Sequence, residues 1–269
     1  MKQITDIEEV KRIQLDILSA FDSFCRSNGI QYTIIDGTLL GAVRHKGYIP
    51  WDDDIDVAMN RMNYDLFIRV FPSLYDGKYK LASLERDKHW DKAYACMYDD
   101  RTMLQFPNTK LITTGIQIDI FPLDEVPDDE KDWNTLKRKV FLFQRLSTIK
   151  SSPFHVSHSL IKNIIAFMIK IFLLPISKRT LAIMHNNLAK SGNGKGYKHC
   201  YEVAFGPMGE NRMSINDFDI AIDYPFEDRI VLGIKNAHSV LTANYGDYMQ
   251  LPPEEKRVTH HSFKAFWKD

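Results

Sequence analysis

The chain has 269 residues, of which 44% are hydrophobic and 12% aromatic, and its formal net charge is zero. This composition excludes a disordered chain and allows a full hydrophobic core. The three cysteines, Cys25, Cys96 and Cys200, lie far apart without a CxxC pair, which argues against a disulfide framework or a zinc cluster. The N-terminal residues hold no apolar signal core, so we expect a cytoplasmic protein in a reducing compartment.

Basic and acidic residues are unevenly distributed along this neutral chain. Residues 131–198 hold 13 Lys or Arg residues and a single acid, Asp132, whereas the rest of the chain holds 22 basic and 34 acidic side chains. Such asymmetry predicts that one region meets an anionic partner while another holds metal; the alternative is that the two regions simply attract each other. We do not expect nucleic acid to be the partner.

The chain begins with an expected amphipathic helix over 5–27, because apolar residues recur there at helical spacing. Thr5 and Glu8 form a capping box at its start, and Asn28-Gly29 supplies its stop. The elements expected next are a strand over 32–35, a turn at 36–38, a helix over 39–44, a loop over 45–50 and a strand over 55–59.

The stretch 116–121 alternates apolar and polar residues, which is typical of a half-buried strand. Ile118 and Ile120 point one way, whereas Gln117 and Asp119 point the other. An aspartate between isoleucines opposes strand propensity and indicates a function for Asp119; the alternative is a strand-end residue that caps the turn at 122–124. Upstream of this strand we expect a helix over 62–71 and strands over 79–83, 93–98 and 102–106.

Four aspartates lie within five positions, namely Asp52, Asp53, Asp54 and Asp56. Clustered carboxylates repel one another unless a cation binds them, and hard divalent cations prefer oxygen ligands. Strand alternation puts Asp54 and Asp56 on one face, with the intervening apolar side chains toward the core. With Asp119 from a neighbouring strand, these two acids predict a three-carboxylate metal site for phosphoryl transfer, in which all three are catalytic.

After residue 127 the sequence becomes mainly helical and basic. A helix over 128–150 carries an apolar stripe. The segment 159–178 is apolar nearly all round but is interrupted by Lys162, Asn163 and Lys170, which makes it marginal as a membrane-spanning helix. One interpretation is an interfacial helix on an anionic bilayer, at the inner face of the cell membrane. The other is a helix buried in the core or in a dimer contact.

The C-terminal segment holds four cationic or titratable side chains after a rigid Pro252-Pro253 turn: Lys256, Arg257, His260 and His261. If the chain returns to the carboxylates, these side chains would contact substrate phosphates. The alternative is a solvated tail.

Three blocks of the sequence carry a resemblance to a known family. They read G-T-L-L-G-A-V-R-H-K-G-Y-I-P-W-D-D-D-I-D-V at 37–57, I-D-I-F-P-L-D at 118–124 and Y-G-D-Y-M-Q-L-P-P-E-E-K-R at 245–257. In this order they resemble the LicD family, the bacterial phosphocholine transferases related to the fukutin group. That family belongs to the nucleotidyltransferase superfamily, so the resemblance implies an α+β fold with a nucleotidyltransferase-like mixed β-sheet flanked by helices.

The superfamily pattern is a Gly-Ser-like turn, then an acid–apolar–acid strand, then a third acid. Here these positions are Gly37-Thr38, Asp54 and Asp56, and Asp119, with threonine in place of the usual serine. The resemblance implies transfer of a phospho-alcohol, most often phosphocholine from CDP-choline, to a hydroxyl of a cell-surface glycan precursor of the teichoic acid or lipopolysaccharide type. CMP would leave, and Mg²⁺ or Mn²⁺ would be the cofactor.

The resemblance and the side-chain chemistry together assign further roles. Asp119 or Asp53 would orient or deprotonate the acceptor hydroxyl. Trp51, Tyr48 and Tyr98 are candidates for an aromatic cage around a quaternary ammonium, or are core residues. The substrate-binding residues that we expect are Gly37, Thr38, Arg44, His45, Lys46, Trp51, Asp53, Lys256, Arg257 and His260, with the three basic residues at 44–46 on phosphate oxygens.

The expected organisation has three parts: a nucleotidyltransferase-like catalytic core at 1–127, a basic helical insertion at 128–200 for membrane or acceptor contact, and a C-terminal segment at 201–269 that completes the catalytic domain. The expected partners are CDP-choline and a lipid-linked or oligosaccharide acceptor. Rival functions are the same chemistry with CDP-ribitol, CDP-glycerol or an ethanolamine donor, and a nucleotide-sugar glycosyltransferase. The glycosyltransferase is less favoured because a glycine-rich βαβ fingerprint is missing. An EF-hand is also disfavoured, because the aspartate cluster lacks its central glycine and terminal glutamate.

Overall fold

The computed structural model describes the chain except for residues 107–113, 153–159, 207, 210, 219 and 260–262. His260 and His261, which the sequence suggests as substrate contacts, therefore lie outside the described residues. The helices are α1 (Ile7–Ser27), α2 (Asp36–Arg44), α3 (Arg61–Leu74), α4 (Glu130–Ser151), α5 (Leu160–Phe172), α6 (Lys178–Lys190), α7 (Ile215–Phe218) and α8 (Ala237–Tyr245), with a 3₁₀ turn at Glu254–Lys256.

The strands build two sheets. They are β1 (Lys2–Ile4), β2 (Thr33–Ile34), β3 (Asp56–Asn60), β4 (Tyr79–Ala82), β5 (Ala95–Asp99), β6 (Thr102–Gln105), β7 (Gln117–Val126), β8 (His199–Tyr201), β9 (Met213–Ser214), β10 (Ala221–Phe226), β11 (Arg229–Ile234) and β12 (Lys264–Trp267).

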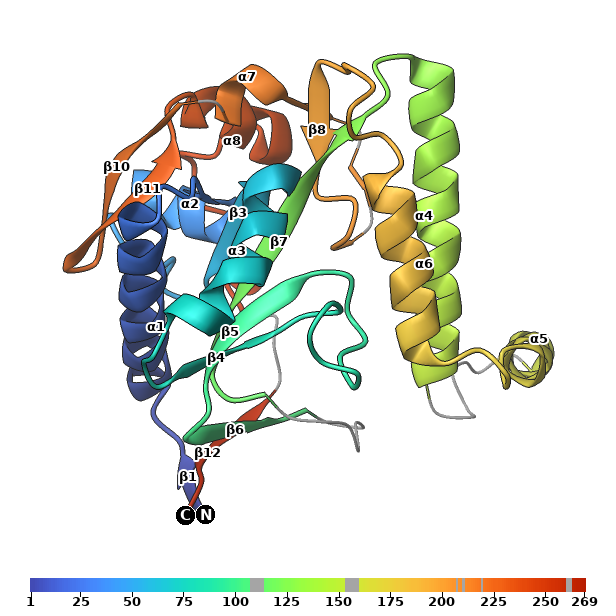
Figure 1. Ribbon diagram of the computed structural model, residues 1–269, viewed down its shortest axis with the longest axis horizontal. Coiled ribbons are helices and arrows are strands. Elements are labelled where there is room, and N and C mark those ends of the chain that lie inside the picture. The colour runs from blue at the N-terminus through green and yellow to red at the C-terminus, as the bar shows by residue number, and fades with distance from the viewer. Residues whose placement is uncertain (107–113, 153–159, 207, 210, 219, 260–262) are drawn as a thin grey trace.

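The larger sheet is mixed and has the order β10-β11-β2-β3-β7-β5-β4, with β8 and β9 joined to the far end of β7. Strand β3 runs parallel to β7, whereas β2 runs antiparallel to β3 and β5 antiparallel to β7. Figure 1 shows helices α1 and α3 against this sheet and the paired helices α4 and α6 beside it. The expected mixed sheet flanked by helices is therefore confirmed.

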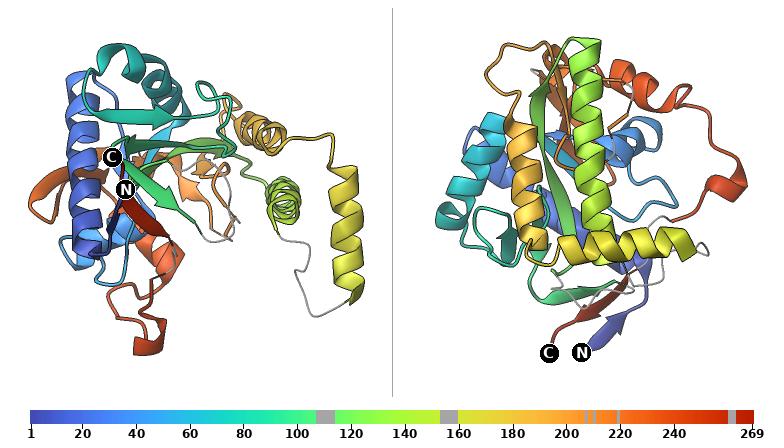
Figure 2. Two further views of the ribbon diagram at one scale, coloured as in Figure 1. Left: turned by 90° about the horizontal axis from the view of Figure 1, so that it is seen from below. Right: turned by 90° about the vertical axis from the view of Figure 1, so that its right-hand side faces the viewer.

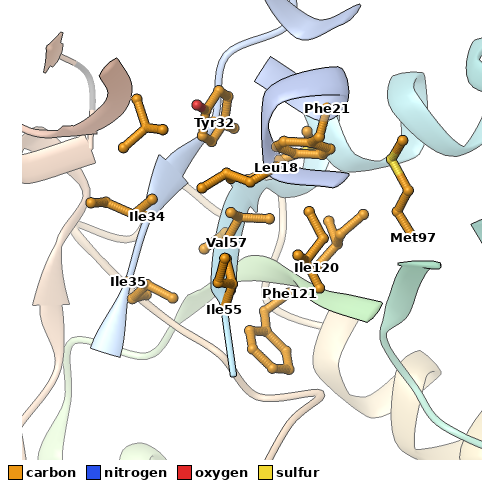
Figure 3. Packing of buried hydrophobic residues seen from close by; sticks show 14 of the residues in the cluster. Leu18, Phe21, Tyr32, Ile34, Ile35, Ile55, Val57, Met97, Ile120 and Phe121 are labelled. Atoms are coloured by element: carbon orange, nitrogen blue, oxygen red, sulfur yellow. The ribbon is translucent and has the colours of Figure 1, made fainter. Parts of the chain in front are cut away.

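Helix α1 covers one face of the central strands. Its apolar side chains recur at helical spacing and are buried, and Figure 3 shows Leu18 and Phe21 facing Val57 on β3 and Ile120 on β7. Burying side chains of this size stabilises a fold by roughly 1.5–3 kcal/mol each. The helix is capped by Asp6, whose side chain accepts from the Glu8 N–H, so the expected cap at Thr5 was one residue early.

A buried ion pair fixes α3 on β7. The Arg61 guanidinium donates to both carboxylate oxygens of Asp124, at 2.7 and 2.6 Å, and Asp124 is fully buried. Bidentate pairing of this kind holds two elements in one geometry. The aspartate that ends the I-D-I-F-P-L-D block thus has a structural partner, and the block places Asp119 earlier on the same strand.

Helices α4 and α6 form a second, smaller core with loops at the end of the sheet. Trp133, Leu136 and Val140 on α4 are buried there with Ala182 and Ala189 on α6. Helix α6 was missed in the sequence, because the segment 159–178 reads as a single apolar element. In the structure α5 ends at Phe172, and α6 begins at Lys178 as a separate helix with Ser177 as its N-cap.

Helix α5 lies at the edge of the molecule, against the end of α4. Figure 2 shows it crossing the ends of α4 and α6 on the outside. Its apolar side chains are exposed, with Ile161 at 70% and Phe172 at 75% of full exposure, so the interpretation as a buried core helix is wrong. Among the described residues, none of the helices combines the length and the apolar character needed to cross a bilayer.

Candidate active site

The Gly-Thr turn opens helix α2 and contacts the carboxylate loop. The Asp56 N–H donates to the Thr38 hydroxyl at 2.9 Å, which ties the helix to the start of β3. A Cβ on Gly37 would lie 2.6 Å from Asp52 Oδ2, so glycine lets the carboxylate approach the helix backbone. The expected turn at 36–38 is in fact the first turn of α2, and Asp36 adopts a positive φ of 49° there.

Two of the predicted acids lie side by side on neighbouring strands. Asp56 on β3 is opposite Asp119 on β7 in the parallel register, and the Asp119 N–H donates to the Ile55 carbonyl oxygen at 3.0 Å. Gln117 Nε2 donates to Asp119 Oδ1 at 2.5 Å and holds that carboxylate in place. Asp119 lies inside a continuous strand, so the interpretation of it as a strand-end cap is wrong.

The carboxylates repel one another strongly. Burial, and then the charges of Asp54 and Asp119, raise the pKa of Asp56 well above its ordinary value. Asp52, Asp53 and Asp54 also offer ligand atoms that lie within 4.8 Å of one another. Asp54 therefore belongs to a close group with its two loop neighbours and acts electrostatically on Asp56.

This donor set fits a hard divalent cation. A bound cation would offset the repulsion that raises the pKa of Asp56, and oxygen ligands suit Mg²⁺. The three acids whose ligand atoms lie close together, Asp52, Asp53 and Asp54, are not the three predicted ligands. Asp54 belongs to both sets. The loop before β3 thus offers two carboxylates, Asp52 and Asp53, in addition to the predicted ligands.

A cavity of about 200 Å³ opens onto these acids. It is lined by Asp53, Asp54, Asp56 and Asp119 together with residues that the sequence reasoning missed, chiefly Lys92, Tyr94, Gln117 and Phe205. Lys92 places its amine 5.1 Å from the centre of the Tyr94 ring. Burial lowers the pKa of Lys92, but the Tyr94 phenol and the Asp119 carboxylate outweigh that effect and raise the pKa, so the amine stays charged beside the acids.

No local pattern in the sequence indicated Lys92 and Tyr94. Both lie in bends before β5, where strand alternation does not apply. They reach the carboxylates because β5 pairs with β7, with Cys96 opposite Asp119, and this pairing joins segments that are remote in sequence.

A second pair of acids lies behind the first. Burial raises the pKa of Glu202, and the charge of Asp36 and the hydrogen bond between their side chains raise it further. Burial likewise raises the pKa of Asp36, although its hydrogen bond with Glu202 works in the opposite direction. The two carboxyl groups thus favour sharing a proton, and both add to the negative field at Asp56.

The C-terminal block returns to the Gly-Thr turn and forms a larger pocket of about 530 Å³. Lys256 lines this pocket, and the Arg257 guanidinium lies 5.8 Å from the centre of the Trp51 ring. The interpretation of this block as a solvated tail is therefore wrong. The pocket is lined mainly by Gly37, Arg44, Ile49, Trp51, Asp52, Tyr245, Asp247, Tyr248, Gln250, Pro252, Pro253 and Lys256.

The basic trio is split by the turn that follows α2. Arg44 lines the larger pocket, and its guanidinium donates to the Tyr248 carbonyl oxygen at 2.6 Å and to His45 Nε2 at 2.9 Å. The His45 ring lies 6.4 Å from the Trp51 ring, edge to face. Lys46 is exposed, has a φ of 64°, and donates to the Val43 carbonyl oxygen at 3.3 Å.

The aromatic cage candidates occupy different places. Tyr48 is buried, and its hydroxyl donates to Gln14 Oε1 at 3.0 Å. Tyr98 packs against the core formed with α4 and α6. Trp51 alone among these three lines the larger pocket.

Comparison with known proteins agrees with the architecture of the site. The family described as LicD/FKTN/FKRP, nucleotidyltransferase domain, matches residues 29–156. The chain is 32% identical to the lipopolysaccharide cholinephosphotransferase LicD of Haemophilus influenzae over 273 residues, which cover 99% of each protein.

Two shorter matches are to uncharacterized proteins. One, of Rickettsia typhi, is 36% identical over 76 residues, covering 28% of this chain and 25% of that protein. The other, of Rickettsia prowazekii, is 62% identical over 32 residues, or 12% of each. The similarity along the whole chain to the Haemophilus protein, with the domain match, shows that this protein belongs to the LicD family.

Proposed function

We propose that the protein transfers phosphocholine from CDP-choline to a hydroxyl of a lipopolysaccharide glycan and releases CMP. The observation that carries this proposal is the facing pair Asp56 and Asp119, with Asp54 beside them on the wall of the small cavity, together with the larger pocket at the Gly-Thr turn. The name of the Haemophilus relative supports the choline phosphate group and favours lipopolysaccharide over teichoic acid as the acceptor.

The reaction exchanges one phosphorus–oxygen bond for another. The acceptor oxygen bonds to the phosphorus that carries choline, and the bond from that phosphorus to the bridging oxygen breaks. The electron pair stays on the phosphate of departing CMP, and the hydroxyl proton passes through a carboxylate to solvent.

The carboxylates are the proposed cation site. Asp54, Asp56 and Asp119 would hold Mg²⁺ or Mn²⁺, and a cation there neutralises charge that develops on the diphosphate oxygens. Gln117 orients Asp119 through its hydrogen bond. Asp119 or Asp53 accepts the proton of the acceptor hydroxyl, since both line the small cavity.

The larger pocket is the proposed donor site. Arg44 and Lys256 line it and supply positive charge for diphosphate oxygens, and Arg257 lies over the ring of Trp51, which also lines it. The indole face of Trp51 suits either a pyrimidine base or a quaternary ammonium. His45 supports Arg44 by accepting its hydrogen bond.

A donor panel tests the proposal. The protein is incubated with a divalent cation, deacylated lipopolysaccharide and one donor at a time: CDP-choline, CDP-ribitol, CDP-glycerol, CDP-ethanolamine or a UDP-sugar. We expect CMP release and incorporation of label into the glycan with CDP-choline. Preference for another CDP-alcohol would support the same transfer reaction with a different donor. UDP release from a UDP-sugar would instead identify a glycosyltransferase and reject the proposal.

The exposed helix α5 supports a peripheral membrane contact. Most of its apolar side chains are exposed, and cationic side chains are abundant on the neighbouring helices α4 and α6. An amphipathic helix with a cationic surround partitions into the interface of an anionic bilayer. We infer that α5 brings the site to a lipid-linked acceptor at the membrane surface.

A further inference from the structure

A groove of about 500 Å³ lies between the catalytic sheet and the helices α4 and α6. Its volume is within the range typical of small-molecule sites. It has three walls, formed by the segment 91–94 before β5, the C-terminal half of α4 and the segment 204–206, with α6 at its base. The resemblance to the family assigns no residue of this groove a role.

The groove leads to the carboxylates. Lys92, Tyr94 and Phe205 line both this groove and the cavity that contains Asp56 and Asp119. Tyr94 and Phe205 are in aromatic contact, with ring centres 5.7 Å apart. A molecule that lies in the groove and extends past these side chains would therefore reach the carboxylates.

The groove has polar groups that lack protein partners. The Nε2 atoms of Gln144 on α4 and His185 on α6 are buried and make no hydrogen bond to the part of the chain that the structure describes. Burial lowers the pKa of His185, so the imidazole is neutral at physiological pH, and its ring stacks on Phe143 at 6.1 Å. Buried polar atoms without partners are costly, and a hydroxylated ligand would satisfy them.

The charge of the groove is positive. Arg145 is exposed at its edge, with its guanidinium 5.6 Å from the centre of the Phe141 ring, and no carboxylate among the described residues pairs with it. Lys92 adds a second cation at the inner end, and Asp91 is the one acid in the described lining. Cations, aromatic faces and amide or hydroxyl groups together suit a sugar chain that carries an anionic substituent.

We propose that this groove is the acceptor subsite and that it binds a phosphorylated oligosaccharide whose reacting hydroxyl passes between Lys92 and Tyr94 to the carboxylates. This inference rests on the proposed function and adds the location and the charge of its acceptor. Arg145 pairs with a phosphate on the sugar chain, and Gln144 donates to a sugar oxygen.

Direct binding, measured without any donor, tests the groove. The probes are deacylated lipopolysaccharide and the same material after dephosphorylation, titrated calorimetrically into the native protein and into three variants. Arg145→Gln and Gln144→Leu alter the groove, whereas Arg138→Gln removes the same charge from an exposed position on the same helix. We expect each groove variant to bind the phosphorylated probe roughly fivefold or more weakly, and Arg138→Gln to bind like the native protein.

The dephosphorylated probe shows how much of the binding depends on the phosphate and how much on the sugar chain. It should bind the native protein more weakly than the phosphorylated probe does, and Arg145→Gln should weaken its binding little further. Native binding of neither probe, or equal binding by the groove variants and the native protein, would overturn the proposal. The unfolding midpoint of each variant, measured in parallel, shows that a loss of binding is not a loss of fold.

Release of CMP from CDP-choline, assayed separately, distinguishes this inference from the proposed function. Groove-dependent binding without CMP release leaves the acceptor subsite standing and rejects the donor chemistry. CMP release, together with unaltered probe binding by Arg145→Gln and Gln144→Leu, supports the donor chemistry and rejects the acceptor subsite.

Discussion

Negative charge is concentrated at Asp56 by residues from four separate parts of the chain. Asp54 precedes the same strand, Asp119 lies on the next strand, and Asp36 and Glu202 lie behind. Asp54 and Asp56 were predicted together because strand alternation is a local pattern, whereas Asp119 was singled out because an aspartate between isoleucines opposes strand propensity. The contribution of Glu202 was not predictable, since nothing near it in the sequence indicates that the chain returns to Asp36.

The shared proton of Asp36 and Glu202 predicts a pH-dependent stability. A carboxyl group whose pKa is raised in the folded state contributes stability that is fully present below its unfolded pKa and is lost as the pH rises through the folded pKa. For Glu202 this loss begins above the ordinary value of 4.5 and continues to the raised pKa. The free energy of unfolding of the native protein should therefore fall as the pH increases through this window.

Glu202→Gln removes this ionisation while keeping a group that hydrogen-bonds to Asp36. The free energy of unfolding of the variant should depend less on pH than that of the native protein. Above the ordinary pKa of the carboxyl group, the difference in favour of the variant should grow by up to about 1.4 kcal/mol per pH unit. Urea unfolding from about pH 5 to about pH 9 measures it. Glu85→Gln, at an exposed position, is the control. The same slope in the native protein and in Glu202→Gln would reject the shared proton.

At the scale of the elements, boundaries were less predictable than the elements themselves. Strand β7 was expected to end before Pro122, because proline cannot donate to a sheet. It continues to Val126, since β3 pairs with it as far as Leu123 and β8 takes over from Asp124. The strand partners, which are remote in sequence, decide the length.

Helix α5 shows the same limit in another way. Its apolar sequence fits a buried helix, an interfacial helix and a dimer contact equally well, because hydrophobicity does not reveal what covers it. The structure removes the buried alternative, because most apolar side chains of this helix are exposed and it lies on the outside of the molecule (Figure 2). The proposed bilayer contact then follows from the cations around it.

Substituting exposed apolar residues tests the bilayer contact. The triple variant Ile161→Ser, Phe172→Ser, Leu174→Ser should partition roughly tenfold or more weakly onto phosphatidylglycerol vesicles at low salt, because each substitution removes apolar area from the interface. Sedimentation with the vesicles measures the partition. Leu74→Ser, at a position 60% exposed on α3, is the matched control and should partition like the native protein. A native protein that ignores these vesicles would reject the contact.

At the scale of the whole molecule, the carboxylates and the cations lie on different elements. The acids belong to the central sheet and its loops, and the residues 131–198 with their excess of Lys and Arg form α4, α5 and α6 beside it (Figure 1). Within the described residues, an ion pair from Lys190 on α6 to Asp65 on α3, at 3.3 Å, joins the two regions. The groove between them is where a substrate would meet both kinds of charge.

The three-part division of the chain stays a prediction. In the sheets, strands from the C-terminal part pair with strands from the N-terminal part. Strands β10 and β11, from the C-terminal part, pair beside β2, and β1 pairs with β12 so that the two ends of the chain lie together. The resemblance to a family made the mixed sheet foreseeable. Four residues of the proposed donor pocket, Gly37, Arg44, Trp51 and Lys256, were predicted as substrate contacts. The proposed acceptor groove was not foreseeable, because it is lined by segments that meet only after folding.

We propose that phosphocholine transfer by this protein depends on a cation at Asp54, Asp56 and Asp119. The most direct test follows CMP and labelled glycan together, with CDP-choline and deacylated lipopolysaccharide, for the native protein and for Asp56→Asn. With Mg²⁺ the native protein should release one CMP for each phosphocholine incorporated, and chelation should stop both. Asp56→Asn should lose roughly 10³-fold or more of the rate, because a bound cation supplies several kcal/mol of transition-state stabilisation. Transfer that continues undiminished in Asp56→Asn, or in the presence of chelator, would contradict the account.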